Sequence, residues 1–151
     1  MLSETEYGWT KFRLEGTGDY WLGYLTDVPF KWLDAAIHGL ETMSGFSVSG
    51  MMEPNYFICE VCDDHSLITV EDQYTHGIIS SEKSPVGIMG FCEELYSDIL
   101  RDIGEFVKGF MLVTIEDDDE YELEMMLRRQ ELTRRLDHLR CLLNEKRQSE
   151  G

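Results

Sequence analysis

Four cysteines and four histidines are the first residues to consider for chemistry. Cys59, Cys62 and His65 have the ligand types and the close spacing of a zinc site. A fourth ligand would then be His76 or Cys92. A zinc knuckle, however, places its C-x-x-C in a tight turn, usually with glycine, and no glycine lies between these two cysteines. A thioredoxin-like redox site needs the same motif at a helix N-terminus.

The surrounding stretch 56–71 predicts a β-hairpin with an acidic tip, which weakens the zinc interpretation. A turn at Asp64-His65, or a wider loop over 63–66, sets one register. The predicted cross-strand pairs are Val61 with Ile68 and Cys59 with Val70. Residues three apart on a strand point to opposite faces, so Cys59 enters the core and Cys62 points away. We therefore expect buried or half-buried thiols and predict no metal ligand.

Three carboxylates, Glu94, Asp98 and Asp102, lie four residues apart along one edge of a predicted helix. Each neighbouring pair of like charges costs about 0.2–0.5 kcal/mol in an isolated helix, and Arg101 is near enough to offset part of it. The edge is either a solvated outer face or a docking stripe for a basic partner. A hydrolase that uses clustered acids and a divalent ion is a further interpretation, although such sites recruit acids from several elements.

Acidic residues also cluster at the predicted hairpin tip, after that hairpin and before the last helix. Turns and helix N-termini favour acids for local reasons, so their number suggests function more than any one of them. Exposed tyrosines beside carboxylates are common anchors at protein interfaces. The predicted partner-binding residues are Asp63, Asp64, Glu71, Asp72, Tyr74, Glu94, Asp98, Asp102, Asp117 and Asp118.

Catalytic signatures are absent from the sequence. It has no G-x-S-x-G, P-loop, G-x-G-x-x-G or H-E-x-x-H motif. The glycines at 16–18 form a predicted hairpin turn, and no helix follows them to receive a phosphate. We therefore predict no catalytic residue, no cofactor and no enzymatic activity.

The charge balance limits the partners. The 151 residues include 30 acidic and 13 basic side chains, for a net charge of −17. Nucleic acid and anionic membrane surfaces are disfavoured, because binding to either depends on Lys and Arg. No apolar run approaches the roughly 20 residues that span a bilayer. The expected partner is a basic protein.

Length, cysteine spacing and the N-terminal residues predict the organisation and the compartment. The length suits one domain over 1–151, and 42% hydrophobic residues are enough for a core. The cysteines follow no disulfide framework, and the first residues contain neither a basic nor an apolar leader region. We expect a cytoplasmic protein with reduced thiols.

Alternating hydrophobic residues predict strands that must position these groups. A first hairpin covers 9–25, with its turn at 16–19. Its predicted pairs are Leu14 with Trp21 and Phe12 with Gly23. Two more strands cover 46–52 and, less regularly, 76–80.

Two helices precede the last one. Asp27 as N-cap and Pro29 in the first turn begin a helix that runs to about Met43. The dipeptide at 84–85 begins a second helix, whose apolar residues recur at intervals of three and four as far as Gly109. The apolar run 111–115 is either a strand or a buried connection.

The last helix covers 118–147, and Asp119 with Glu122 resembles a capping box. An apolar seam with nearly heptad spacing either packs on the sheet or joins a second copy. Its residues are Met125, Leu132, Leu136, Leu139 and Leu143. The sequence thus predicts an α+β fold with a mostly antiparallel sheet of about five to seven strands built from hairpins, and three helices, the last one long.

In size, acidity and general composition, the chain resembles the immunity proteins of bacterial toxin systems, including those that protect against contact-dependent growth inhibition. The resemblance implies a protein that binds a cognate, basic toxin domain, for example a nuclease, and blocks it with carboxylates that mimic phosphate. One alternative is a scaffold or regulatory protein that dimerises through its C-terminal helix. The other is the acid-cluster hydrolase.

Overall fold

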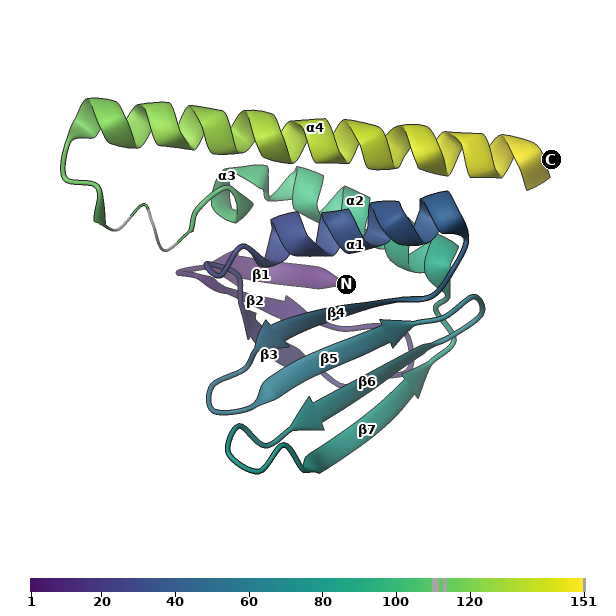
Figure 1. Ribbon diagram of the computed structural model, residues 1–151. Helices are drawn as coiled ribbons and strands as arrows, with labels where there is room; N and C mark the ends of the chain where they lie inside the picture. Colours follow the sequence, from purple (N-terminus) through teal and green to yellow (C-terminus); the bar gives the residue numbers. More distant parts are fainter. Residues whose placement is uncertain (110–111, 113, 151) are drawn as a thin grey trace.

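The chain folds into a seven-stranded antiparallel sheet with helices on one face (Figure 1), which confirms the predicted α+β class. The structure is a computed structural model that describes residues 1–109, 112 and 114–150. The strands are β1 (Leu2–Glu6), β2 (Trp9–Phe12), β3 (Tyr20–Gly23), β4 (Phe46–Met51), β5 (Tyr56–Val61), β6 (Ser66–Glu71) and β7 (Ile78–Ser84). The helices are α1 (Val28–Thr42), α2 (Ile88–Arg101), α3 (Ile103–Phe106) and α4 (Asp118–Glu150).

The strands lie side by side in sequence order, and the sheet curls strongly. Only Gly23 and Met51 pair β3 with β4, so the sheet bends at that joint. The curl brings the β2–β3 side back to the last strand, where the Tyr20 hydroxyl donates a hydrogen bond to Glu82. The Ser84 hydroxyl donates to the Glu15 carbonyl at 2.8 Å. The C-terminal half of β7 is therefore tied to the β2–β3 segment.

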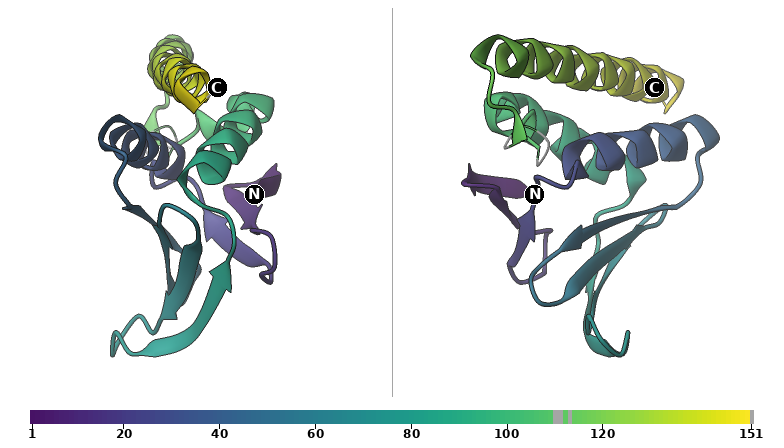
Figure 2. Two further views of the ribbon diagram at one scale, coloured as in Figure 1. Left: turned by 90° about the vertical axis from the view of Figure 1, so that its right-hand side faces the viewer. Right: turned by 60° about the vertical axis from the view of Figure 1, so that its left-hand side comes forward.

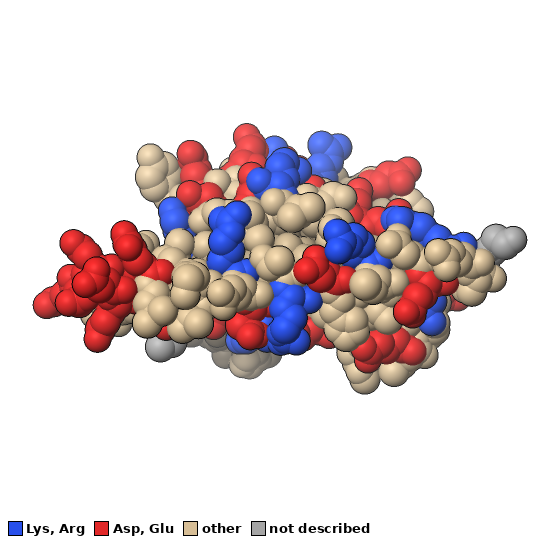
Figure 3. Space-filling model, turned by 90° about the horizontal axis from the view of Figure 1, so that it is seen from above, with Lys and Arg blue, Asp and Glu red and all other residues tan. Residues whose placement is uncertain are grey.

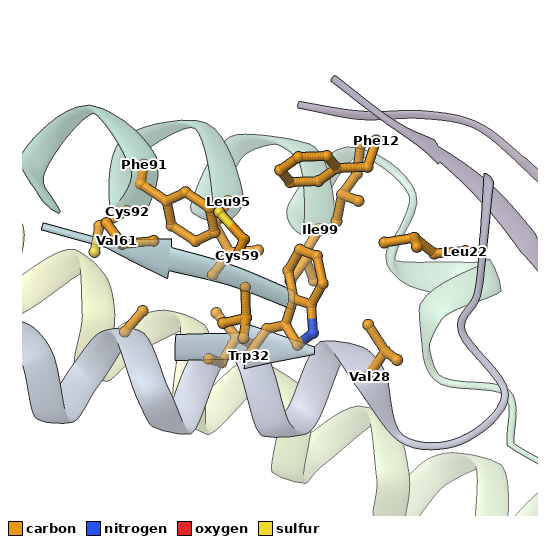
Figure 4. Close-up of a cluster of buried hydrophobic side chains, with 14 of the residues drawn as sticks. Phe12, Leu22, Val28, Trp32, Cys59, Val61, Phe91, Cys92, Leu95 and Ile99 are labelled. Carbon is orange, nitrogen blue, oxygen red and sulfur yellow. The ribbon is translucent and has the colours of Figure 1, made fainter. Parts of the chain in front are cut away.

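Three layers result: the sheet, then α1 and α2, then α4 lying across both helices (Figure 2). The core between the first two layers is aromatic, with Trp32 of α1 at its centre (Figure 4). Its indole nitrogen donates to the Ser49 carbonyl at 2.8 Å, so the one polar atom of this ring is satisfied. Phe91, Leu95 and Ile99 of α2 fill the same core.

The 56–71 hairpin forms as predicted, with its register shifted by two residues. Cys59 lies opposite Ile68, and the Cys62 amide donates to the His65 carbonyl at 2.8 Å, so the turn is at Asp63-Asp64. Because the shift is even, every side chain keeps its predicted face, and Cys59 is fully buried. The buried Ser66 hydroxyl donates to the Val86 carbonyl at 2.6 Å, a contact with the segment before α2 that local sequence does not reveal.

The N-terminal hairpin differs more from the prediction. A strand that was not predicted, β1, precedes it, and Phe12 lies opposite Tyr20 instead of Gly23. This shift is odd, so the predicted pairing of Leu14 with Trp21 is wrong: Leu14 is buried and Trp21 is 47% exposed. The cause is a longer connection in which the Thr17 hydroxyl bonds to the backbone of Leu14.

The second predicted helix begins later and ends earlier than expected. Ser84 is the last residue of β7, which is longer than the predicted 76–80 strand, and α2 begins only at Ile88. The helical run breaks at Asp102, which separates α2 from the short α3. Two residues of the apolar run 111–115, Met111 and Val113, lie outside the described residues, and Leu112 is buried.

The last helix begins at Asp118 as predicted and continues to Glu150. Its cap is Asp117, whose carboxylate accepts from the Glu120 amide at 3.0 Å, instead of the predicted Asp119. The leucines of the seam are buried against α1 and α2, neither on the sheet nor against a second copy. Asp27 stands at the N-cap position of α1 without capping it, because its carboxylate pairs with Arg128 of α4 at 2.8 Å.

Candidate functional site

A hollow of about 430 Å³ opens where the β1–β2 turn, α3 and the start of α4 meet. We call it the tyrosine hollow, and the end of the molecule around it the acidic end. Three tyrosines, two carboxylates and one ammonium group stand out among its lining residues. The lining residues are Glu6, Tyr7, Gly8, Tyr24, Leu25, Glu105, Lys108, Gly109, Leu112 and Tyr121.

The β1–β2 turn presents Tyr7 at the rim. Glu6 pairs with Trp9, leaving a two-residue loop in which Tyr7 has φ 52° and Gly8 has φ 85°. Positive φ at both central residues is the signature of a type I′ hairpin turn, which favours Asn-Gly. Tyrosine is an unfavourable choice at its first central position, and the ring is 89% exposed. Such an outlier points to a role for the side chain beyond the turn itself.

Tyr24 forms the floor of the hollow. Its ring is fully buried, and its hydroxyl accepts from the Gly8 amide at 3.2 Å and donates to Glu105 at 3.0 Å. Burial, with the nearby negative charge of Glu105 as a smaller cause, raises the pKa of Tyr24 to about 12. The Tyr24 hydroxyl therefore keeps its proton at neutral pH and holds the Glu105 carboxylate in one position.

Glu105 is the best-placed carboxylate in the tyrosine hollow. Lys108 lies 3.0 Å from it, and this hydrogen bond, followed by that from Tyr24, holds the pKa of Glu105 below its ordinary value. The group is thus ionised and half-exposed. A carboxylate fixed between aromatic rings can accept hydrogen bonds from a guanidinium or ammonium group, while the rings offer their faces to the same cation.

The first turn of α4 adds negative charge beside the hollow. Asp118, Asp119 and Glu120 occupy it, where they interact favourably with the positive end of the helix dipole. Seen from above, a dense group of acidic side chains covers this end of the molecule, and Lys and Arg lie further along the helix (Figure 3). A cation that approaches the acidic end therefore meets a negative potential.

No family model, curated protein or solved structure matches the chain significantly.

The ten predicted partner-binding residues lie at four separate places. Asp63 and Asp64 form the β5–β6 turn, and Glu71, Asp72 and Tyr74 lie at the opposite end of β6. Glu94, Asp98 and Asp102 are on or just after α2, and Asp117 and Asp118 begin α4. Of the ten, only Asp102, Asp117 and Asp118 lie at the acidic end. Asp102 is close enough for its charge to help raise the pKa of Tyr24.

Asp98 is wrongly predicted as part of an exposed edge. It is 9% exposed, and its carboxylate accepts from the Leu2 amide at 3.0 Å and from Arg101 at 2.9 Å. Arg101 also donates to the Leu2 carbonyl at 2.6 Å, so the pair fastens β1 to α2. Asp98 thus stabilises the fold and is not accessible to a partner, whereas Glu94 remains exposed on the same helix.

The carboxylates at the two β6 turns have local partners. Asp72 accepts from the Tyr74 and Thr75 amides at 2.9 Å, and these backbone donors, Thr75 first, hold the pKa of Asp72 low. Asp64 accepts from His65, which lowers the pKa of Asp64. Tyr74 is 83% exposed beside Asp72, so this turn remains a second predicted anchor, and it does not line the tyrosine hollow.

Two of the four cysteines, Cys59 and Cys92, are buried in the core. Burial raises the pKa of Cys59 and of Cys92 to about 12 in each case. Cys62 is half-buried, in agreement with the predicted burial of this thiol, while Cys141 is exposed on α4. Within the described ranges, no group of three or more His, Cys, Asp or Glu side chains is close enough to bind a metal ion. None of the described helices has the length and hydrophobicity to cross a bilayer.

Sequence reasoning missed Tyr7, Tyr24, Glu105 and Lys108 as site residues. The sequence did contain a signal for this turn. A two-residue hairpin turn often has glycine as its second residue, and Tyr7-Gly8 fits that pattern between two alternating stretches. No local sequence pattern predicts that α3 lies next to this turn, because the position of α3 depends on the break in the helix at Asp102.

Proposed function

We propose that the protein is a cytoplasmic inhibitor of a basic protein toxin, of the bacterial immunity kind, and that it binds this toxin through the acidic end. The observation that carries the proposal is the tyrosine hollow itself: an open cavity with aromatic walls and an ionised carboxylate, Glu105, in acidic surroundings. Acidic surroundings accelerate the encounter with a basic protein, and aromatic anchors in a hollow prolong the complex.

Each part of the hollow has a distinct role in this proposal. Glu6 and Glu105 accept hydrogen bonds from Lys or Arg side chains of the toxin. Tyr7 and Tyr121 cover their aliphatic stems, since tyrosine supplies contact area at a low entropic cost. For a nuclease toxin, the same basic side chains bind substrate phosphates, so the carboxylates compete with the substrate directly.

The neighbouring reading frame gives the first test. A large secreted protein with a variable C-terminal domain, encoded immediately upstream, is the expected finding. An operon of metabolic enzymes contradicts the proposal.

The association rate with that C-terminal domain gives the second test. We expect it to fall by at least about tenfold between about 50 and 500 mM NaCl, because salt screens the steering field. Association that is insensitive to salt contradicts steering by the acidic end.

A matched pair of variants locates the contact. Glu105→Gln removes the fixed carboxylate and leaves Lys108 uncompensated, so we expect faster dissociation of the complex. Glu60→Gln removes the same charge from an exposed position on β5 and serves as the control. Equal dissociation rates for both variants would place the toxin elsewhere.

A further inference from the structure

The outer face of α4 is uncovered by the rest of the described chain. The helix forms the third layer, and the views from the side place no other element beyond it (Figures 1 and 2). Its inner face is occupied, because Leu132, Leu136 and Leu139 pack on α1 and α2. The side chains on the outer face are therefore accessible to another molecule.

That outer face carries an apolar stripe in its N-terminal half. Leu123, Met126 and Leu127 are 53%, 49% and 45% exposed, and they recur at intervals of three and four residues. Side chains at such intervals share one side of a helix. About half of each of these side chains stays exposed, so a second molecule on this face would bury further apolar area.

Charges of opposite sign border the stripe on either side. Acids precede it along α4, and arginines follow it. The acids before the stripe are Asp118, Asp119, Glu120 and Glu122, and the nearest arginines beyond it that do not pair with α1 are Arg129 and Arg134, with Glu131 and Asp137 beside them. Glu120 and Arg134 fall on the same 3–4 spacing as Leu123 and Leu127, so they lie at the two ends of one continuous line.

A shallow hollow of about 470 Å³ lies just beyond the stripe, toward the arginines. Its lining residues are Met126, Arg129, Gln130, Thr133, Arg134 and Asp137. The segment from Glu120 to Asp137 is about 26 Å long at 1.5 Å per residue, so acid, apolar stripe, hollow and arginine follow each other within a length that one helix can cover.

We propose that two copies of the chain associate through the outer faces of α4, with the helices antiparallel and Leu123 of each copy seated on the hollow of the other. This register places Glu120 of one copy opposite Arg134 of the other, and the two-fold axis repeats both contacts. A parallel arrangement would instead put acid against acid. The order of charge along the helix therefore fits a second copy of the same segment.

Two effects oppose the pairing, and neither excludes it. The net charge of −17 on each copy is repulsive, but salt screens it beyond about 8 Å at physiological ionic strength, whereas Glu120 and Arg134 meet at contact. Arg134 also bonds to Glu131 within its own helix at 3.0 Å. That pair is exposed, and exposed pairs of this kind contribute little.

Charge exchange tests the register. Sedimentation over a range of concentrations is expected to show a dimer of the wild-type protein, and Glu120→Arg or Arg134→Glu alone should raise its dissociation constant by at least about tenfold. The double variant Glu120→Arg/Arg134→Glu restores opposite charges across the interface, so the dimer returns. A wild-type protein that stays monomeric, or a double variant that does not recover, overturns the proposal.

The dimer contact shares Glu120 with the acidic end, so Arg134 is the residue that separates it from the proposed toxin binding. Arg134 lies on the outer face and does not line the tyrosine hollow, so Arg134→Glu should dissociate the dimer while leaving toxin affinity unchanged. Melting followed by circular dichroism verifies that each variant stays folded. Glu105→Gln is the converse variant. It should stay folded and still dimerise while it loses toxin binding, which would show that the two contacts are separate.

Discussion

At the scale of single residues, Tyr7 is the most informative side chain. It stands at the first central position of the β1–β2 turn with φ 52°, where a tyrosine pays a conformational cost that asparagine largely avoids. Its exposed ring lies at the rim of the tyrosine hollow. Tyrosine is thus unfavourable for the backbone conformation at this position but well placed to contact a partner.

Tyr7→Asn should therefore raise the free energy of unfolding by up to about 1 kcal/mol, as measured by urea denaturation. Tyr7→Val is the matched control: a β-branched residue is least compatible with positive φ, so this variant should be less stable than wild type. An Asn variant less stable than the Val variant would contradict the assignment of the turn.

The buried thiols make a prediction at alkaline pH. The folded pKa of Cys92, about 12, lies above that of an unfolded cysteine, so the neutral thiol stabilises the fold up to about pH 9. That contribution is lost as the pH rises from about 9 toward 12. In Cys92→Ala, the decline of the unfolding free energy between about pH 9 and 11 should be shallower by about 1.4 kcal/mol per pH unit.

Urea denaturation at several pH values measures this slope. Cys141→Ala is the control for the loss of one thiol, because Cys141 is exposed. Parallel slopes for wild type and Cys92→Ala would show that the thiol is not protected by burial.

At the scale of elements, α4 has two faces with different roles. The inner face holds the molecule together through buried leucines and through Arg128, which reaches Asp27 at 2.8 Å and stacks over the Phe30 ring at 4.7 Å. The outer face contributes no such contact to the described chain. Mutations on the two faces should therefore have separable effects.

Leu136→Asp places a carboxylate at a position that is 2% exposed and should lower the free energy of unfolding by at least about 3 kcal/mol. Leu123→Asp changes the same residue type at a position that is 53% exposed, and at concentrations where the protein is monomeric it should cost less than about 0.5 kcal/mol. Thermal melting compares them. A stable Leu136→Asp variant would contradict the packing of α4 on α1 and α2.

At the scale of the whole molecule, the sequence predicted the fold class and most elements, because their signals are local. The apolar periods of α1 and α4, and the alternation around Cys59 and Ile68, identify each element and its buried face. The registers were wrong, since they depend on tertiary contacts: Ser66 with Val86, and the curl that carries Tyr20 to Glu82.

The candidate site was less predictable for the same reason. A count of acids cannot tell Asp98, buried under the N-terminal strand, from Asp117 on the surface. The tyrosine hollow needs the β1–β2 turn, α3 and the start of α4 together, and the turn lies about a hundred residues before the other two in the sequence. The composition thus predicted an acidic surface, but it did not predict where on the surface the acidic residues gather.

The central claim is that a basic partner binds at the acidic end, and one comparison of affinities tests it directly. Tyr7→Asn and Tyr74→Asn each remove a tyrosine ring that is more than four-fifths exposed, one at the tyrosine hollow and one at the β6–β7 turn. Calorimetric titration with the toxin domain should show Kd raised by at least about tenfold for Tyr7→Asn and by less than about twofold for Tyr74→Asn. The reverse order would contradict the claim and move the interface to the β6–β7 turn.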